Sequence, residues 1–275
     1  MPELPETETI ARDLDRELAG ARITDIRVIK ADVLRGVDAA TLRRRVSGAS
    51  IERCWRRAKL VVLNLSSHDR LVVQPRFTGG LLIDDGSLPP RERQYGTIDF
   101  ALDDGRVLLY RDIRRLGTVA LMTREEFSRY VAHLGIEPLD PAFTATHLSA
   151  LLRVARRTVK QVLMDQRVVA GIGNIYANEA LWRAGIDPSR LACTLSTTET
   201  SDLRDAIADV LMASIAARGT SFRDYRDARG GRGQFVEQLV VYGRGGEPCL
   251  RCGRRLVETH VIDGRTTVLC ANCQR

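Results

Sequence analysis

Four cysteines near the C-terminal end form two C-x-x-C pairs. They follow the spacing Cys249-x2-Cys252-x17-Cys270-x2-Cys273. Two such pairs joined by a hairpin-length segment are typical of a tetrahedral zinc site with four thiolate ligands. Because all four ligands come from the protein, we expect the zinc ion to be structural. Cys54 and Cys193 stand alone, so the pattern indicates metal binding in a reducing compartment and not a disulfide framework.

The composition is that of a globular, moderately basic protein. Its 275 residues are 44% hydrophobic and 28% charged, which excludes a disordered or fibrous chain and allows two modest domains. The 42 lysines and arginines exceed the 35 acidic residues, and this excess favours a polyanionic partner. No apolar stretch has the length of a membrane span, and MPELPETET lacks the features of a secretory signal, so we expect a cytoplasmic protein that does not enter membranes.

Two hydrophobic periodicities divide the chain. A helical pattern over residues 5–18 is followed by period-two runs from Arg22 to about Ala120. They predict an α+β protein whose first domain, residues 1–133, is a β-sandwich with an N-terminal helix. The proline-containing segment 134–145 is interpreted as a linker. Residues 146–240 are predicted to form a helical domain, because apolar residues have helical spacing at 146–163, 175–184 and 197–217. This domain also contains a long exposed loop at 218–235, and the zinc finger follows at 241–275.

A glycine-containing turn lies between two of the predicted helices. Gly171 and Gly173 permit a tight turn before Asn174, where the amides at a helix N-terminus can bind an anion. Basic residues crowd the preceding helix: Arg153, Arg156, Arg157 and Lys160. We interpret the arrangement as a helix–turn–helix clamp for a phosphate backbone. The alternative is that Asn174 is only an N-cap residue.

The second residue, Pro2, would become the N-terminus if Met1 is removed. An α-amine titrates at about pH 7.7–8.0, so a useful fraction of it is unprotonated and nucleophilic at neutral pH. Glu3 could then donate or accept protons. By itself this tripeptide carries little information, because a chain can begin Met-Pro-Glu by accident.

Six motifs, in the same order, resemble the formamidopyrimidine-DNA glycosylase family, whose relatives include endonuclease VIII. The resemblance extends through nearly the whole chain. The motifs are MPELPETET at the start, RRAKLVVL at 56–63, DIRRLG at 112–117, AGIGNIYANEALWRAGIDP at 170–188, VYGRGGEPC at 241–249 and DGRTTVLCANCQR at 263–275.

The resemblance implies a bifunctional DNA glycosylase and abasic-site lyase of base excision repair. Such an enzyme excises 8-oxoguanine and formamidopyrimidines through an N-terminal proline Schiff base and then nicks the strand by β,δ-elimination. It implies a β-sandwich domain, a helix–two-turn–helix domain and a zinc finger that holds one structural zinc ion. The partner is double-stranded DNA with an oxidised base, and we expect a monomer that works in the cytoplasm at the nucleoid. The segment 218–235 resembles the loop that caps the lesion.

The resemblance also implies roles for single residues. Pro2 matches the nucleophile, and Glu3 matches the proton donor. Lys59 matches a hairpin lysine linked to β-elimination, and Arg265 matches the zinc-finger arginine linked to phosphate binding and δ-elimination. Asn174 matches the phosphate-gripping asparagine, and Arg156 lies near the basic contact of the helical domain.

A base inside a duplex must be flipped out before it can be excised, and side chains must fill the space that it leaves. Arg114, Phe77 and Leu116 match the family's three void-filling positions. The surrounding residues depart from the usual family pattern. The segment around Phe77, residues 74–79, is QPRFTG where the family usually has HLGMTG. Leu116 replaces a phenylalanine, and Tyr95 replaces a DNA-contacting histidine. These departures affect the choice of substrate and not the reaction class.

Two alternatives remain at this stage. A non-catalytic damaged-DNA-binding protein could use the same basic surface, although it would have no need of Pro2, Glu3 and Lys59. An enzyme of the endonuclease VIII type would excise oxidised pyrimidines. Without the resemblance, a solvated pair at a strand end is the favoured interpretation of Arg114 with Arg115, and Phe77 is equally interpreted as a core aromatic beside a bulge.

Overall fold

The computed structural model describes residues 2–275 and divides into two compact units. Unit 1 comprises the residues up to His133 together with Ile215–Val236, and unit 2 comprises Leu134–Ser214 and Glu237–Arg275. Met1, whose removal the sequence analysis considers, lies outside the described residues. Within residues 2–275, no helix is long and apolar enough to cross a membrane.

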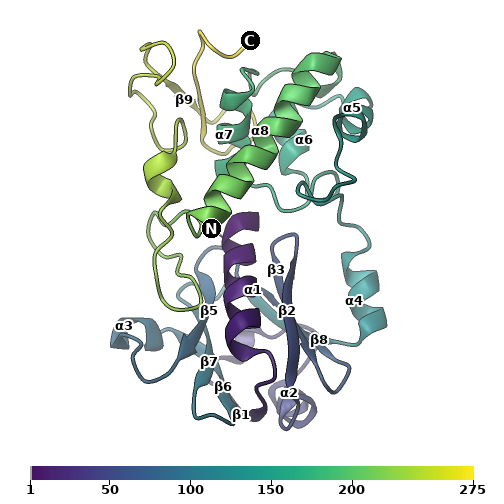
Figure 1. Ribbon diagram of the computed structural model, residues 1–275, viewed down its shortest axis with the longest axis vertical. Coiled ribbons are helices and arrows are strands. Elements are labelled where there is room, and N and C mark those ends of the chain that lie inside the picture. Colours follow the sequence, from purple (N-terminus) through teal and green to yellow (C-terminus); the bar gives the residue numbers. More distant parts are fainter. Residues whose placement is uncertain (1) are drawn as a thin grey trace. The chain divides into compact units, whose positions relative to one another are not determined.

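Unit 1 is a β-sandwich of two four-stranded antiparallel sheets (Figure 1). One sheet has the order β1-β6-β7-β5, with β1 Ile23–Val28, β6 Gly96–Leu102, β7 Val107–Asp112 and β5 Gly79–Asp84. The other has the order β2-β3-β4-β8, with β2 Ile51–Arg57, β3 Leu60–Leu65, β4 Arg70–Gln74 and β8 Thr118–Met122. Alternate residues of both sheets share one buried core, as the period-two pattern predicts.

Helices cover the sandwich. Helix α1 (Leu4–Leu18) buries Ile10, Leu14 and Leu18 in the shared core, so the helix predicted over residues 5–18 is confirmed. Helix α2 (Ala39–Val46) packs beside β1, and α4 (Arg124–Val131) covers the outer face of the second sheet through Phe127. The short elements are the 3-10 turn η1 (Ala31–Val33) and α3 (Pro90–Arg93).

Unit 2 combines helices with a small two-stranded hairpin. Its helices are α5 (Ala145–Arg153), α6 (Val159–Met164), α7 (Asn174–Arg183) and α8 (Thr197–Ala216), whose last residues belong to unit 1. The 3-10 turns are η2 (Ala192–Thr194) and η3 (Phe235–Gln238), and the hairpin is β9 (Val257–Thr259) with β10 (Thr267–Leu269). The predicted α+β class, with a sandwich, a helical domain and a zinc finger, is confirmed.

The helical pattern over 146–163 forms two helices instead of one. The chain breaks at residues 154–158, where Thr158 forms an antiparallel bridge with Leu191 and caps α6 by accepting the Gln161 N–H at 3.3 Å. The expected linker is also structured within unit 2: Ile136 bridges Val169, and Phe143 is fully buried. Contacts with residues distant in sequence cause both differences.

The segment 218–235 is not the exposed loop that its composition indicates. It belongs to unit 1 and not to the helical domain, and Tyr225 and Ala228 are part of the sandwich core. Ala228 O accepts a 2.7 Å hydrogen bond from Ile83 N–H of β5. Arg218 pairs with Asp13 of α1 and with Asp227 of the loop itself, and Arg226 pairs with Glu92 of α3. The polar composition of the loop therefore reflects pairing within unit 1 more than solvation.

Gly117 provides a test of the packing between β4 and β8. A Cβ at this position would contact the Tyr110 hydroxyl and lie 2.8 Å from Gln74 O and 2.9 Å from Pro75 O. We expect Gly117→Ala to reduce the free energy of unfolding by about 1–3 kcal/mol, as overpacking commonly does. Denaturant unfolding measures this. Gly80→Ala, whose Cβ would meet only the Arg111 Nε at 3.9 Å, is the control, and equal effects of the two substitutions would contradict the packing.

Candidate functional site

The start of α1 fixes the N-terminal residues. Pro2 and Glu3 are buried, and Glu3 occupies the N-cap position. The Glu3 N–H donates a 2.8 Å hydrogen bond to Glu6 Oε2, and Pro5 stands in the first turn, where its missing N–H is tolerated. The carboxylate of Glu6 therefore determines the direction in which the chain enters the helix.

Lys59 lies in the turn between β2 and β3, next to the same end of α1. The Thr7 hydroxyl donates to Glu3 O at 2.8 Å and approaches Ala58 O at 3.4 Å. Arg56 reinforces this contact, because its Nε donates to Glu8 Oε2 at 2.7 Å and its Nη1 donates to Ala58 O at 3.0 Å. The structure thus brings Pro2, Glu3 and Lys59 into one region of unit 1.

A second group of predicted residues lies on two neighbouring loops of unit 1. Phe77 is in the β4–β5 turn, and Arg114 and Leu116 are in the β7–β8 connection. The Arg114 guanidinium lies over the Phe77 ring, 5.1 Å from its centroid. Phe77 and Leu116 are 46% and 40% exposed, so both side chains are accessible to a partner.

Asp112, which the sequence analysis missed, ties the two loops together. It is buried, and its carboxylate accepts from the Thr78 hydroxyl at 2.5 Å and from Gly117 N–H at 2.8 Å. Its own N–H donates to Tyr95 O at 3.0 Å, which places half-exposed Tyr95 beside the same loops. Its place at the start of the motif DIRRLG does not by itself indicate this role, which only the fold identifies.

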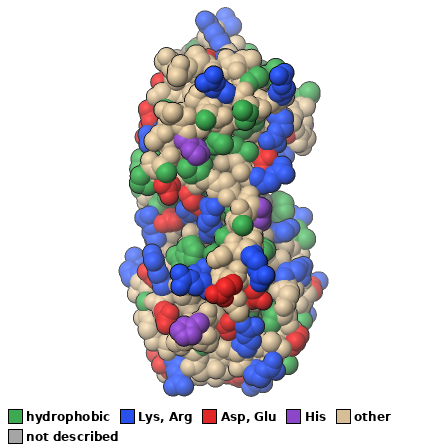
Figure 2. All heavy atoms as spheres, turned by 90° about the vertical axis from the view of Figure 1, so that its right-hand side faces the viewer, with side chains coloured by type: hydrophobic (Ala, Val, Ile, Leu, Met, Phe, Trp, Pro, Cys, Tyr) green, Lys and Arg blue, Asp and Glu red, His purple; other side chains and the backbone are tan. Residues whose placement is uncertain are grey.

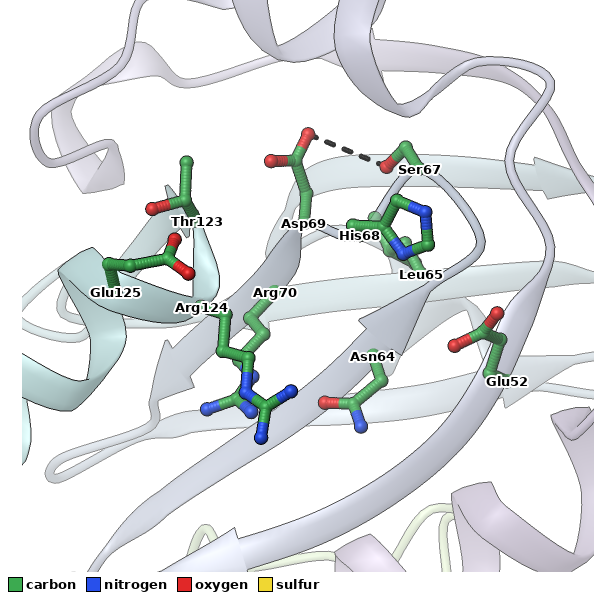
Figure 3. A pocket seen from close by; sticks show the side chains of 10 residues that line it. All are labelled: Glu52, Asn64, Leu65, Ser67, His68, Asp69, Arg70, Thr123, Arg124 and Glu125. Carbon is green, nitrogen blue, oxygen red and sulfur yellow. Dashed lines mark hydrogen bonds between the residues drawn. The ribbon is translucent and has the colours of Figure 1, made fainter.

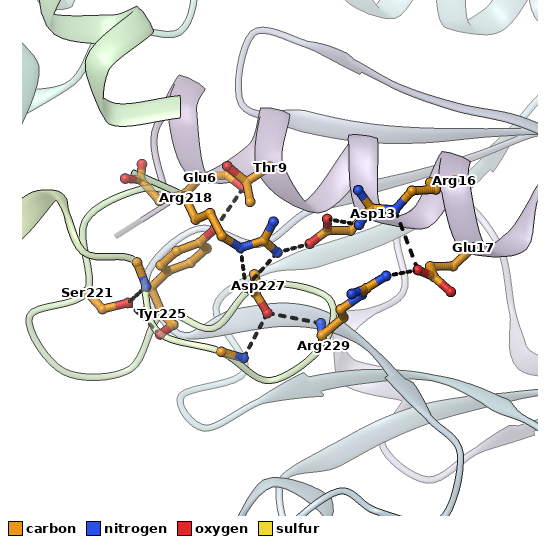
Figure 4. A network of polar contacts seen from close by, with 12 residues as sticks. Glu6, Thr9, Asp13, Arg16, Glu17, Arg218, Ser221, Tyr225, Asp227 and Arg229 are labelled. Atoms are coloured by element: carbon orange, nitrogen blue, oxygen red, sulfur yellow. Dashed lines mark hydrogen bonds and ion pairs between the residues drawn. The ribbon is translucent and has the colours of Figure 1, made fainter. Parts of the chain in front are cut away.

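The loop 218–235 packs along α1 (Figure 4). Glu6 Oε1 accepts the Thr220 N–H at 2.8 Å, while its other oxygen holds Glu3. Arg218 contacts both Asp13 of α1 and Asp227 of the loop, and Arg229 pairs with Glu17. On the sandwich side, buried Arg111 contacts Glu92 at 3.1 Å and donates to Asp224 O. The loop is therefore attached to the helix that begins at Glu3.

In unit 2, Asn174 and Arg265 come close together through Thr266. Gly173, not Asn174, is the N-cap residue of α7, and Asn174 Nδ2 donates to Thr266 O at 2.9 Å. Arg265 is exposed in the hairpin tip, where its N–H donates to Asp263 Oδ1 at 3.1 Å. Asn174 is therefore not the N-cap residue, and its side chain holds the tip that carries Arg265.

The basic residues that the sequence predicts on one helix do not lie together on a helix in the structure. Arg156 is exposed, but it lies in the break between α5 and α6. Lys160 is fully buried and donates to Thr267 Oγ1 at 2.7 Å and to Thr266 O at 3.3 Å. Burial lowers the pKa of Lys160, against the attraction of Asp263. Lys160 thus supports the hairpin tip from inside and does not contribute to a phosphate clamp.

The four predicted ligand cysteines meet in unit 2. The Sγ atoms of Cys249, Cys252, Cys270 and Cys273 all lie within 4.8 Å of one another. Burial opposes ionisation of Cys249, but the N–H groups of Arg251 and Cys252 lower its pKa to about 6, which suits a thiolate ligand. The four thiolates fit a structural zinc ion, whose positive charge would hold the two C-x-x-C pairs together.

Buried Glu179 of α7 connects the helices to the zinc finger. Its carboxylate accepts the N–H groups of Val240, Val241 and Tyr242 at 2.8–3.0 Å. Burial raises its pKa, and the three N–H groups act in the opposite direction. A glutamate within a helix does not by itself indicate this role.

A cavity of about 640 Å³ in unit 1 lies between the β3–β4 turn and the start of α4 (Figure 3). Its lining mixes Arg70 and Arg124 with Asp69 and Glu125, and it includes none of the predicted site residues. Figure 2 shows that arginines and lysines on the face in view alternate with acidic side chains. On that face the basic surplus is spread out and not gathered into one patch.

Comparison with known proteins agrees with the fold and with the zinc finger. The formamidopyrimidine-DNA glycosylase N-terminal domain matches residues 1–119, its H2TH domain matches 134–226, and a zinc finger found in FPG and IleRS matches 246–275. Together these define the class of zinc-finger DNA glycosylases. A formamidopyrimidine-DNA glycosylase of Moorella thermoacetica is 45% identical over 258 residues, which cover 93% of each chain.

Solved structures of Lactococcus lactis Fpg are similar over the whole chain. The complex with DNA containing N7-benzyl-Fapy-dG has a TM-score of 0.91 at 30% identity and covers 100% of both chains. The complex with DNA containing an oxidised pyrimidine has a TM-score of 0.90, again at 30% identity with both chains fully covered. The chain belongs to the formamidopyrimidine-DNA glycosylase family, which confirms the resemblance that its motifs indicate.

Removal of zinc tests whether the metal holds the hairpin tip. We expect chelation to unfold residues 249–273, release the tip that carries Arg265, and abolish DNA binding. Trp182 packs with Cys249 and Cys270 and lies under the Arg251 guanidinium, 4.4 Å from it. In a Trp55→Phe background Trp182 is the only tryptophan, so its fluorescence reports the unfolding. Full DNA affinity in a protein shown to lack zinc would contradict this account.

Proposed function

We propose that this protein excises oxidised purines, such as 8-oxoguanine and formamidopyrimidines, from double-stranded DNA and then cleaves the strand at the abasic site. The observation that supports the proposal most strongly is the arrangement at the start of α1. The N–H of Glu3, the residue after Pro2, is held by Glu6, the Lys59 turn contacts the first turn of the helix through Thr7, and the loop 218–235 is bonded to the same glutamate. The name of the Moorella relative and the Fapy-dG complex of the Lactococcus protein agree with this substrate class.

The reaction begins after loss of Met1, which leaves the secondary amine of Pro2 as the nucleophile. The nitrogen attacks C1′ of the flipped nucleotide, the C1′–base bond breaks, and the base leaves with a proton. The C1′–O4′ bond then breaks as O4′ takes up a proton, and the nitrogen lone pair forms the iminium with C1′. This iminium makes the C2′ proton acidic, so that its removal eliminates the 3′ phosphate. Glu3 is the proton donor in this scheme, and Lys59 assists β-elimination. One amine therefore serves both as glycosylase and as lyase nucleophile.

DNA contacts in this proposal come from both units. Phe77, Arg114 and Leu116 fill the space left by the flipped base, with Tyr95 beside them, because they are exposed and fixed by Asp112. Arg156, Asn174 and Arg265 contact phosphates, Arg265 also assists δ-elimination, and the loop 218–235 caps the excised base. All of these residues belong to one chain, so we propose a monomer that acts on nucleoid DNA in the cytoplasm.

Borohydride trapping tests the nucleophile. Reduction of the iminium links protein and DNA covalently, so the wild-type protein should form an adduct with an 8-oxoguanine:cytosine duplex. We expect Pro2→Gly to reduce trapping by more than about tenfold, because the secondary amine is lost. Pro5→Ala, which changes the other proline of the same turn and leaves the N-terminal amine intact, should trap normally. Absence of an adduct on both this duplex and an abasic-site duplex, with DNA binding intact, would contradict the enzymatic mechanism.

Oxidised pyrimidines are a second candidate substrate. The Lactococcus Fpg complex contains an oxidised pyrimidine, and the void-filling residues of this chain depart from the usual family pattern at Phe77 and Leu116. Single-turnover base release from 8-oxoguanine and from oxidised-pyrimidine duplexes separates the two possibilities. Faster release of the purine supports the first proposal, and faster release of the pyrimidine favours the second.

A further inference from the structure

Arg218 occupies an unusual place at the neck of the loop 218–235. Its φ is +62°, a left-handed conformation that glycine adopts easily and residues with a side chain generally avoid. The two ends of the loop meet here: Gln234 N–H donates to Ala217 O at 2.8 Å, and Phe235 N–H donates to Gly219 O at 3.0 Å. An arginine at this point therefore needs compensation from its surroundings.

The compensation comes from two buried carboxylates. Arg218 Nη2 contacts Asp13 of α1 and lies 2.6 Å from Asp227 Oδ2, and its Nε donates to the same Asp227 oxygen at 2.8 Å. The side chains of Asp13 and Asp227 are only 2% and 5% exposed. Arg16 also pairs with Asp13, at 2.8 Å from its Oδ1, whereas Arg218 contacts both carboxylates. Without the Arg218 guanidinium, two like charges from the helix and from the loop would face each other at low exposure.

Asp227 also organises the loop itself. Its Oδ1 accepts the N–H groups of Arg229 at 3.0 Å and Gly231 at 2.8 Å, and its own N–H donates to Gly231 O at 3.0 Å. The position of Asp227 thus sets the path of residues 227–231. Since Arg218 joins this carboxylate to Asp13, it connects the ordered part of the loop to the helix.

We propose that Arg218 is a positioning residue, a latch that fastens the loop to α1 and thereby fixes the loop relative to Pro2 and Glu3 at the start of that helix. This inference rests on the proposed function in one respect, the capping of the excised base by the loop. The Arg218 side chain is itself 41% exposed, but both of its carboxylate partners are nearly buried. In the Arg229–Glu17 pair the side chains are 58% and 27% exposed, and the surrounding water weakens the attraction.

Hydrogen exchange tests the latch without reference to activity. Arg218→Gly removes the guanidinium while glycine keeps the left-handed backbone, and Arg229→Gln is the matched control that removes the exposed pair. We expect amides of residues 219–233 to exchange about tenfold faster in Arg218→Gly and within about twofold of wild type in Arg229→Gln. Asp13→Asn, which leaves the loop sequence unchanged, should loosen the same segment and decides the matter if Arg218→Gly does not fold. Unchanged exchange would overturn the proposal.

Kinetics test whether the latch positions the loop for base excision. In single turnovers we expect Arg218→Gly to slow base release from an 8-oxoguanine duplex about tenfold, and to leave cleavage of a preformed abasic site within about twofold, because no base is there for the loop to hold. Equal losses on both substrates, or faster exchange with unchanged base release, would contradict a positioning role. If wild-type protein releases no oxidised base at all, the proposed function fails, and the exchange experiment still decides whether Arg218 fastens the loop.

Discussion

The carboxylate of Glu6 is the contact on which the arrangement of the candidate site in unit 1 depends. One oxygen accepts the N–H of Glu3 and the other accepts the N–H of Thr220, each at 2.8 Å. A single buried side chain therefore connects the first residues of the chain to a loop more than two hundred residues later. A buried carboxylate that loses such partners is strongly disfavoured, so the N-terminus and the loop are held together by the need to satisfy Glu6.

Unit 2 is also held together by buried polar groups, here around the four cysteines that would bind the zinc ion. The four cysteines approach within 4.8 Å of one another, which would be unfavourable for four thiolates without a cation. Around this centre, buried Glu179 holds the chain that enters the finger, and Lys160 and Asn174 hold the tip at Thr266. In both units, buried charged groups paired with backbone atoms place exposed arginines and aromatic side chains at defined positions.

Local patterns predict the fold better than they predict the surroundings of the site. The 3.6-residue spacing of Ile10, Leu14 and Leu18, the period-two strands and the C-x-x-C pairs each reflect chemistry within a short segment, and all three reappear in the structure. The break before Thr158, the burial of Lys160 and the attachment of the loop at Arg218 depend on residues far away in sequence, such as Leu191, Thr267 and Asp13. Asp112 and Glu6 lie in motifs that carry the resemblance, but their contacts could not be predicted for the same reason. The roles of Pro2, Glu3 and Lys59 in the reaction remain predictions that rest on family resemblance and on their proximity.

The central claim is that the amine of Pro2 forms the covalent intermediate. Mass spectrometry of a trypsin-digested, borohydride-reduced adduct tests it most directly, because cleavage after Arg12 isolates the peptide PELPETETIAR. The account predicts that this peptide lacks Met1 and carries the reduced sugar fragment on the nitrogen of its first residue. A fragment attached to the Lys59 side chain, or a peptide that retains Met1 in the adduct, would contradict it.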